Sequence, residues 1–301
     1  MRIPIALICD RNFLMQTTVT ITSILENKAP DTEIVFYVVA AGPKEETWPE
    51  LLRYPNLTVI HAGTEIGKDI RQHAHISNAC LLKFYLAELI PQEDKLLYLD
   101  GDIIVRGDLA ELYSTDIGEN YALGAPAVFE NGKINAGVML FDCEKMRRDN
   151  MAEKLMEYRR GLGDIKSMDQ STFNAMIPHQ IGRFSWKYNC IPSVIREAAD
   201  KKSLEELNRQ NKTQYRSLGM MFRDAVVIHY ASATKPWQYT FVEFGDEWYQ
   251  YYLRSPFGDT PLRRQTKIEY WAKKAKKIGV YTMVKNKLHR LLHSPATDEW
   301  G

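Results

Sequence analysis

The sequence between residues 96 and 105 is Leu96-Leu97-Tyr98-Leu99-Asp100-Gly101-Asp102-Ile103-Ile104-Val105. An apolar run of this length predicts a strand that is buried on both faces. Two carboxylates interrupt the run, and a buried carboxylate needs a proton, a partner or a metal ion. Because alternate residues of an extended chain project to the same side, we expect Asp100 and Asp102 to meet at one cation, with Gly101 leaving room for a ligand. Carboxylate oxygens suit Mg²⁺ or Mn²⁺, the ions that accompany diphosphates.

The same triplet has a second interpretation, in which a strand ends in a turn and both carboxylates are solvated. The context favours the metal site, because the triplet lies deep inside the chain and further apolar residues follow it. A bare Asp-x-Asp triplet, without that context, would carry no weight.

The first 120 residues alternate between apolar runs and helical patterns. The apolar runs predict strands at 3–8, 34–40, 57–60 and 96–105. Helical spacing predicts helices at 15–28 and 78–90, with Ser77 as a cap for the second. Strands that alternate with helices indicate a parallel sheet covered on both faces, so the expected fold class is α/β. A nucleotide would bind at the carboxyl ends of such strands, where Asp10 follows the first one.

The second half of the chain has a less regular pattern. Residues 135–142 predict a turn that leads into another buried strand, and 225–228 predict a short strand followed by His229. Helices are predicted at 144–160 and from Asp169 onward, where an acid near the N-terminus interacts favourably with the helix dipole. The polar, lysine-rich segment 200–217 is expected to be an excursion on the surface.

No Gly-x-Gly-x-x-Gly motif and no Walker loop follows the first predicted strand. The usual dinucleotide-binding and P-loop folds would therefore lack their phosphate cradle. A nucleotidyltransferase would share the expected fold and metal, but it too would need a glycine-rich pyrophosphate loop at this place. The sequence disfavours all three classes.

Composition is that of an ordinary soluble protein with room for a substantial core, since 45% of the residues are hydrophobic and 26% are charged. The four cysteines, at positions 9, 80, 143 and 190, are far apart and show no Cys-x-x-Cys spacing. We therefore expect reduced thiols and a cytoplasmic protein. The short apolar run at the N-terminus ends in a charge, which predicts a first strand and not a signal peptide. No stretch approaches 18 apolar residues, so no membrane-spanning helix is expected.

The C-terminal segment 262–293 carries ten Lys or Arg and one acid, so its net charge is +9 and that of the remaining chain is −8. An acidic body with a basic tail is unlike a general nucleic-acid binder, and no nucleic-acid partner is expected. Apolar residues of the segment, Ile268 and Trp271 among them, share one helical face with lysines opposite, which is typical of a helix on an anionic membrane surface. The alternative is a helix pair packed on the body. We expect a catalytic domain at 1–261 and a basic amphipathic helical tail at 262–301.

The segment from Ile228 to Trp237 contains two groups that would complement the carboxylates. His229 is a candidate third metal ligand, because an imidazole nitrogen can join two oxygen donors. Lys235, in a loop stiffened by Pro236, is a candidate for neutralising a departing diphosphate. Taken singly, such residues are more often a core histidine and a surface charge.

Several blocks of this sequence, in order, resemble glycosyltransferase family 8, whose members are retaining enzymes that use nucleotide-diphosphate sugars. The blocks cover nearly all of the first 240 residues and lie at 9–13, 75–77, 97–102, 135–137, 169–170 and 229–237. The length and the basic tail are similar to those of the bacterial lipooligosaccharide galactosyltransferase subgroup. The resemblance implies a Rossmann-like nucleotide-diphospho-sugar transferase fold with a mixed, mostly parallel sheet. It also implies a bound Mn²⁺ or Mg²⁺ and a UDP-sugar donor that carries galactose or glucose.

The resemblance assigns a role to each matched residue. Metal ligands would be Asp100, Asp102 and His229. Uridine would be bound by Asp10 and Asn12, with Phe13 packed on the uracil. The donor sugar would be lined by Asn135, Ala136 and Asp169, with Gln170 beside the anomeric carbon, and the phosphates would be contacted by Lys235.

Three positions depart from the family pattern. Lys83 stands where an arginine usually lies near the donor, and a lysine cannot bind two oxygens in arginine's fork-like manner, so the choice of sugar stays open there. Ser232 stands where a glycine often lets the backbone approach the phosphates, and we include both residues in the donor site. The segment 126–134 is short where the subgroup has a loop over the acceptor, which predicts a different or more open acceptor site.

The expected activity is transfer of galactose or glucose to a glycan or lipid-linked acceptor, by a peripheral protein on the inner face of the membrane. Retention by double displacement would need a carboxylate nucleophile, for which Asp169 is the candidate. Because the neighbouring family position is an amide, we favour same-face attack by the acceptor, with the carbonyl of Gln170 steadying the oxocarbenium-like centre. Two other functions stay open: a glycogenin-like protein that glycosylates its own tyrosine, and a sugar-nucleotide binder without turnover.

Overall fold

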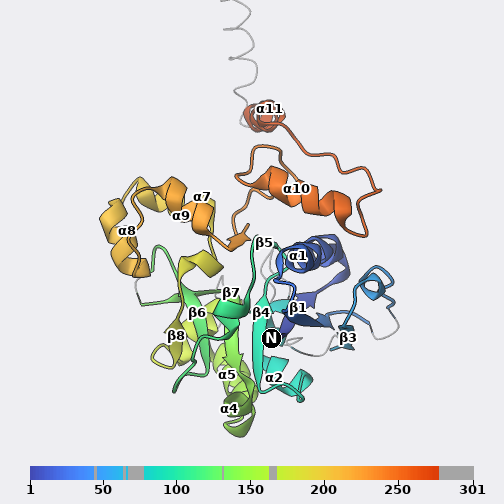
Figure 1. Cartoon of the computed structure of the whole chain (residues 1–301), viewed down its shortest axis with the longest axis vertical. Coiled ribbons are helices and arrows are strands. Elements are labelled where there is room, and N and C mark those ends of the chain that lie inside the picture. The colour runs from blue at the N-terminus through green and yellow to red at the C-terminus, as the bar shows by residue number, and fades with distance from the viewer. Residues whose placement is uncertain (44–45, 64–65, 67–77, 131, 163–167, 278–301) are drawn as a thin grey trace, which may run out of the picture.

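A seven-stranded sheet forms the centre of the computed structural model, which describes residues 1–301 except 44–45, 64–65, 67–77, 131, 163–167 and 278–301 (Figure 1). From one edge to the other, its strands are β3 (Leu57–His61), β2 (Glu33–Ala40), β1 (Arg2–Cys9), β4 (Lys95–Leu99), β7 (Ile134–Asp142), β6 (Ala122–Pro126) and β8 (Ile181–Arg183). The first four are parallel, β7 is antiparallel to both of its neighbours, and β8 is parallel to β6. The predicted α/β class with a mixed, mostly parallel sheet is confirmed.

A second, two-stranded sheet positions the candidate site. It consists of β5 (Ile103–Val105) and β9 (Val227–His229), which pair antiparallel with Ile103 opposite His229. The backbone N–H of Tyr230 extends the pairing by donating to the carbonyl of Asp102 at 2.9 Å. The chain just after the two aspartates is therefore bonded to a strand from a distant part of the sequence.

Side chains of β1 enter two separate cores, because successive residues of a strand point to opposite faces. Ile5 and Leu7 belong to the core shared with α1 (Leu14–Asn27) and α10 (Gly245–Arg254), whereas Ala6 and Ile8 belong to the core on the other face. The second core is covered by η3 (Asn78–Tyr85), α2 (Leu86–Leu89), α4 (Cys143–Arg148), α5 (Met151–Gly161) and α6 (Met168–Met176). The sheet thus has helices on both faces, as an α/β fold requires.

The remaining elements surround the two cores. Short helical turns in the first half are η1 (Arg11–Phe13), η2 (Leu51–Arg53) and α3 (Ala110–Tyr113). A group above β6 and β8 in Figure 1 consists of η4 (Trp186–Tyr188), α7 (Pro192–Ala199), α8 (Leu204–Asn211) and α9 (Leu218–Asp224). The chain then passes through α10, which lies over α1, to α11 (Lys267–Lys277) (Figure 1).

Three predicted elements are divided in the structure. The strand predicted at 96–105 is two strands in different sheets, β4 and β5, because the chain turns between them. The helix predicted at 78–90 is a 3-10 helix through η3 and α-helical only in α2, while Ser77 lies outside the described residues. The helix predicted at 144–160 is interrupted at Asn150, whose φ of 52° is left-handed and incompatible with a continuous α-helix.

Other expectations agree with the structure more closely. The predicted helix at 15–28 is α1, and the short strand predicted before His229 is β9. All four cysteines are free thiols, and three of them are buried. The segment 200–217, expected on the surface, contains α8, whose Leu207 and Asn211 are buried, so one face of this helix packs on the body.

Candidate active site and metal centre

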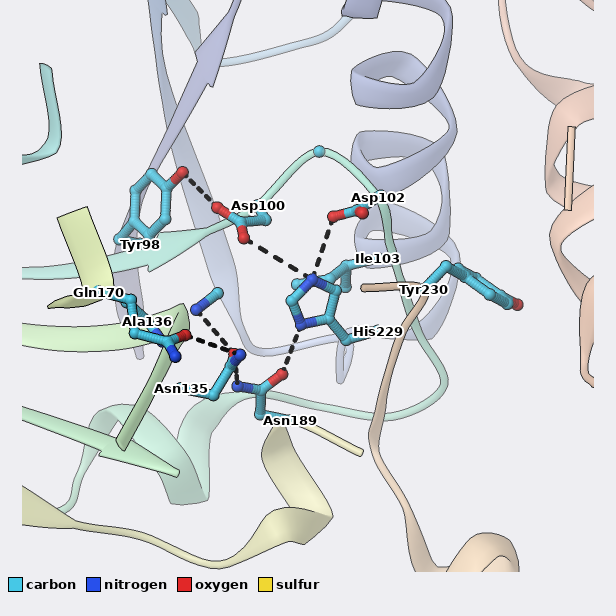
Figure 2. A network of polar contacts seen from close by, with 12 residues as sticks. Tyr98, Asp100, Asp102, Ile103, Asn135, Ala136, Gln170, Asn189, His229 and Tyr230 are labelled. Atoms are coloured by element: carbon cyan, nitrogen blue, oxygen red, sulfur yellow. Dashed lines mark hydrogen bonds and ion pairs between the residues drawn. The ribbon is translucent and has the colours of Figure 1, made fainter. Parts of the chain in front are cut away.

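Three candidate metal ligands meet where the two sheets adjoin. Asp100 follows β4, Asp102 precedes β5, and His229 is the last residue of β9. Because β9 pairs with β5, the imidazole of His229 lies beside the two carboxylates. One ligand atom of each residue lies within 4.8 Å of the other two. His229 Nε2 is 3.1 Å from Asp102 Oδ1 and 3.7 Å from Asp100 Oδ2 (Figure 2). The structure therefore brings these three residues together.

The two carboxylates have different surroundings. Burial raises the pKa of Asp100, and the nearby Lys83 and His229 offset only part of that effect. Burial acts on Asp102 in the same sense, but His229 and Lys235 outweigh it and hold the pKa of Asp102 well below its usual range. A divalent cation between the two groups would stabilise both in the ionised form.

The donor set fits a hard divalent ion. Two carboxylates with one imidazole are ligands that Mg²⁺ and especially Mn²⁺ accept in proteins. His229 Nδ1 lies 2.8 Å from Asn189 Oδ1, so Nε2 is the nitrogen that faces the carboxylates. A histidine whose second nitrogen is hydrogen-bonded to an oxygen in this way is oriented as metal-ligating histidines usually are. Asp100, Asp102 and His229 thus form a candidate metal site.

Two glycines permit this arrangement. A Cβ on Gly137 would lie 2.2 Å from His229 Cε1 and 2.9 Å from Asp100 Oδ2, so a side chain there would displace the ligands. A Cβ on Gly101 would lie 2.8 Å from Thr17 Oγ1 and 3.0 Å from Phe13 Cδ1. The expectation that Gly101 leaves room for a ligand is therefore wrong at this position, because α1 and η1 fill that space.

Two lysines contact the carboxylates from different sides. Lys235 Nζ lies 2.7 Å from Asp102 Oδ2 and donates to the carbonyl of Tyr230 at 2.6 Å. Lys83 is almost completely buried. Its ammonium forms a short ion pair with Asp169 and lies 3.6 Å from Asp100 Oδ1. It also donates a hydrogen bond of 2.8 Å to a backbone carbonyl of β7. Burial alone would lower the pKa of Lys83, but Asp100 and Asp169 outweigh it and raise the pKa. Lys83 is therefore charged beside the candidate metal site.

The carbonyl that Lys83 contacts belongs to Ala136, in the Asn135-Ala136-Gly137 segment of β7. This segment also anchors a side chain from α6, because Gln170 Oε1 accepts from Asn135 Nδ2 at 3.0 Å and from the N–H of Ala136 at 3.2 Å. Both lone pairs of the Gln170 carbonyl are then committed. Within the residues that the structure describes, its amide nitrogen has no hydrogen-bond partner, so the nitrogen is the atom available to a ligand.

The residues assigned to the nucleotide lie at the carboxyl end of β1. Asp10 Oδ1 accepts from the N–H groups of Asn12 and Phe13 at 2.9 and 3.0 Å and so caps η1. The Phe13 ring packs edge-on against Trp237, with centroids 5.8 Å apart, which links η1 to the loop of Lys235. Ser232, in the same loop, donates to the carbonyl of Thr234 at 3.1 Å. These residues remain predicted donor ligands.

Comparison with known proteins identifies the family. Residues 4–240 match the family model described as glycosyl transferase family 8. The chain belongs to this family. The resemblance inferred from the sequence is confirmed, and the chain is a glycosyltransferase homologue over most of its length.

The curated relatives differ in how much of their own length the chain covers. Glycosyltransferase GlyE of Streptococcus pneumoniae serotype 4 is 29% identical over 189 residues, which are 60% of this chain and 42% of GlyE. GlyF of the same organism is 27% identical, and the alignment spans 83% of this chain and 61% of GlyF. A lipopolysaccharide 1,2-glucosyltransferase of Escherichia coli is 26% identical, and the alignment spans 92% of this chain and 88% of that enzyme. The chain thus spans about half of the two streptococcal relatives and most of the Escherichia coli enzyme.

Solved glycosyltransferase structures share the fold. The galactosyltransferase LgtC, in complex with donor and acceptor sugar analogs, superposes with a TM-score of 0.70 at 24% identity and covers 90% of this chain and 100% of LgtC. An active-site mutant of LgtC gives a TM-score of 0.73 over 87% of this chain and 98% of LgtC. At this identity the likeness supports the fold and leaves the choice of substrate open.

Two residues that contact the candidate metal ligands were missed in the sequence. Asn189 holds the imidazole of His229 through its Oδ1, as described above. Tyr98 donates its hydroxyl proton to Asp100 Oδ1 at 2.6 Å, and its ring lies 4.3 Å from the ammonium of Lys83. Tyr98 belongs to the stretch quoted first, where a phenol in an aliphatic strand was a signal for a buried polar partner. For Asn189 there is no comparable signal, because its partners Asn135 and His229 lie on distant segments.

The start of the basic C-terminal segment contacts the body. Tyr239 and Gln265 form an isolated parallel β-bridge. The Tyr270 ring of α11 packs edge-on against the Tyr239 ring, with centroids 5.3 Å apart. Ile268 and Trp271 of the same helix are 81% and 53% exposed. Across the described residues, every helix is too short or too polar to cross a bilayer. Ile278, which the sequence places on the same apolar face, lies outside the described residues.

Proposed function

We propose that the chain transfers a hexose, galactose or glucose, from a UDP-sugar to a glycan or lipid-linked acceptor with retention of anomeric configuration. The observation that carries the proposal is the meeting of Asp100, Asp102 and His229 beside a charged lysine, Lys235, at the carboxyl ends of the parallel strands. Open α/β sheets bind nucleotides at such a place. Membership of glycosyl transferase family 8 and the hexosyltransferase names of relatives support the sugar class.

In this proposal Asp100, Asp102 and His229 would hold Mn²⁺ or Mg²⁺, which would supply positive charge to the diphosphate of the donor. Lys235 would add a second positive charge as the β-phosphate gains negative charge. Asp10, Asn12 and Phe13 would bind the uridine, and the sugar would lie near Asn135 and Gln170. Binding donor and acceptor side by side makes the transfer effectively unimolecular.

We favour same-face attack by the acceptor. The bond from the anomeric carbon to the phosphate oxygen breaks, the acceptor oxygen bonds to that carbon, and the hydroxyl proton passes to the departing phosphate. The ion pair of Asp169 with the buried Lys83 supports this route, since a carboxylate committed to an ammonium is a weaker nucleophile. The carbonyl of Gln170, expected to steady the oxocarbenium-like centre, already accepts two hydrogen bonds. We therefore change its proposed role: Gln170 would orient the sugar through its amide nitrogen.

The test is a panel of UDP-sugars scored for release of UDP with Mn²⁺, with Mg²⁺ and in EDTA. The proposal expects metal-dependent release from UDP-galactose or UDP-glucose, faster with an acceptor glycan than without. Release that is independent of metal would contradict the metal site. A glycosyl adduct on Asp169, found by mass spectrometry, would replace same-face attack with double displacement. A mass increase of the protein itself would favour self-glycosylation, and UDP binding without release would favour a non-catalytic binder.

We also propose that the tail, residues 262–301, docks the catalytic domain of residues 1–261 on an anionic membrane surface such as the inner face of the cell membrane. The exposed Ile268 and Trp271 beside exposed lysines of α11 support this proposal. Replacing both apolar residues with serine should reduce co-sedimentation with phosphatidylglycerol vesicles. Leu52→Ser, at an exposed leucine of η2, is the matched control and should not reduce it. Equal co-sedimentation of the double variant and the wild type would argue for a tail that only packs on the body.

A further inference from the structure

Asn189 connects the candidate metal ligand His229 to strand β7. It is only 2% exposed and follows η4 directly. Its Oδ1 lies 2.8 Å from His229 Nδ1, and its Nδ2 donates to Asn135 Oδ1 at 2.8 Å (Figure 2). Backbone pairing keeps the two segments in register, because the N–H of His229 donates to the carbonyl of Cys190 at 2.7 Å. Asn189 is therefore fixed between β7 and β9.

Backbone donors fix which way each amide of this network points. The N–H of Gly137 donates to Asn135 Oδ1 at 3.0 Å, so that atom must be the oxygen of the amide. The nitrogen of Asn135 then donates to Gln170 Oε1, which also accepts from the backbone of β7. Exchanging the oxygen and nitrogen of either amide would place a donor against a donor or an acceptor against an acceptor. The orientation of the whole network follows from N–H groups of one strand.

This orientation determines the protonation of the histidine. Since Asn135 presents an oxygen, the nitrogen of Asn189 must face it, and the oxygen of Asn189 must face His229. An amide oxygen only accepts, so His229 must carry a proton on Nδ1. Nε2 is then the ring nitrogen left for a cation, and it faces Asp102 Oδ1 at 3.1 Å. The cation between Nε2 and this carboxylate is either a second ring proton or a metal ion, and a metal ion can bind only through the lone pair of Nε2.

We propose that Asn189 is a positioning residue that holds His229 as the Nδ1–H tautomer and so presents Nε2 to the metal ion. The proposal rests on the proposed function for the identity of that ion. Because Asn135 is shared, the same hydrogen-bond network orients the metal ligand at one end and Gln170 at the other. Loss of the acceptor at position 189 would let the proton move to Nε2, where Asp102 would accept it and compete with the metal.

The test compares Asn189→Leu, which removes the acceptor at similar volume, with Asn189→Asp, which keeps an acceptor for Nδ1–H. Asn211→Leu is the matched control, because Asn211 is also buried and accepts from the N–H of Trp186 in the same turn, η4. Binding of Mn²⁺ alone is measured by paramagnetic resonance of the free ion. The protonated nitrogen of His229 is located by ¹⁵N NMR of metal-free protein at mildly alkaline pH, assigned with His229→Gln.

We expect Asn189→Leu to weaken Mn²⁺ binding about 10–100-fold, as loss of such a partner does elsewhere, and to move the proton from Nδ1 to Nε2. Asn189→Asp should keep the proton on Nδ1 and bind Mn²⁺ more tightly than Asn189→Leu, although its second oxygen would oppose Asn135 Oδ1 and lower the affinity below that of wild type. The control should change neither readout. Wild-type Mn²⁺ affinity in Asn189→Leu, or a proton on Nε2 in the wild type, would overturn the proposal.

Two further outcomes are separable. If Asn189→Leu does not fold, Asn189→Asp decides, because a proton on Nε2 in that variant overturns the proposal. If the wild type carries its proton on Nδ1 but binds no Mn²⁺, the proposed metal is wrong and the positioning of His229 by Asn189 stands.

Discussion

Gly137→Ala is the sharpest structural perturbation of the candidate metal site. The added Cβ would lie 2.2 Å from His229 Cε1, 2.6 Å from His229 Nδ1 and 2.9 Å from Asp100 Oδ2. Ordinary carbon–carbon contact begins near 3.5 Å, so the imidazole would have to retreat by about 1 Å. That movement would stretch its bond to Asn189, since the ring is only 3% exposed and has no solvent to move into.

Both stability and turnover should respond to this change. Overpacking a close-packed site costs about 1–3 kcal/mol of unfolding free energy, measurable by denaturant titration. A displacement of about 1 Å at a reacting centre lowers turnover by roughly 10²-fold, measurable as UDP release from the preferred UDP-sugar. Binding of Mn²⁺ should weaken in parallel, because the displaced group is a ligand.

Gly161→Ala provides the control for the same substitution. Gly161 lies in α5, and a Cβ there would meet nothing within 4 Å, so turnover and stability should be unchanged or slightly improved. If Gly137→Ala released UDP at the wild-type rate with wild-type Mn²⁺ affinity, the ligand geometry described above would be refuted.

Three further predictions concern single side chains. Asp102→Asn should lose most metal-dependent turnover without unfolding, because an amide is a weaker ligand; full turnover of this variant in EDTA would remove the metal assignment. Gln170→Ala should lower the rate of UDP release more than it weakens UDP binding by calorimetry, and an unchanged rate would remove Gln170 from the mechanism. Glu93 is hydrogen-bonded by Arg2 at 2.8 Å and Tyr37 at 2.6 Å, and these contacts lower its pKa below 4.5 despite burial. A lowered pKa stabilises the fold above about pH 4.5, and the effect is lost as the pH falls through the lowered value. Glu93→Gln should therefore be less stable than wild type at pH 7, and urea titrations should show this difference shrinking as the pH is lowered below 4.5. A difference that stays the same throughout acidification would contradict this.

The sequence predicted the central strands and the meeting of the two aspartates, but for an incomplete reason. Asp100 and Asp102 were expected to meet because alternate residues of one strand share a side. In the structure they lie in the turn between β4 and β5, and the pairing of β5 with β9 makes them face His229. A continuous apolar run cannot show that its two halves belong to different sheets, because both halves are equally buried.

Long-range polar contacts were the part that the sequence could not show. Lys83 is predicted to bind the donor, but its contacts with Asp100 and Asp169, residues far from it in the chain, could not be foreseen. Asn189 was overlooked because its partners, Asn135 and His229, lie on other elements. Neither hydrophobic periodicity nor motif spacing reports such contacts, since each depends on how distant segments pack.

The most direct test of the account is anomalous diffraction at the manganese edge from crystals soaked with Mn²⁺ and UDP. We expect one strong peak, which marks a Mn²⁺ ion within bonding distance of Asp100, Asp102 and His229 Nε2 and in contact with the diphosphate of UDP. A peak at other residues, or a diphosphate bound with no metal between it and these three side chains, would contradict the central claim.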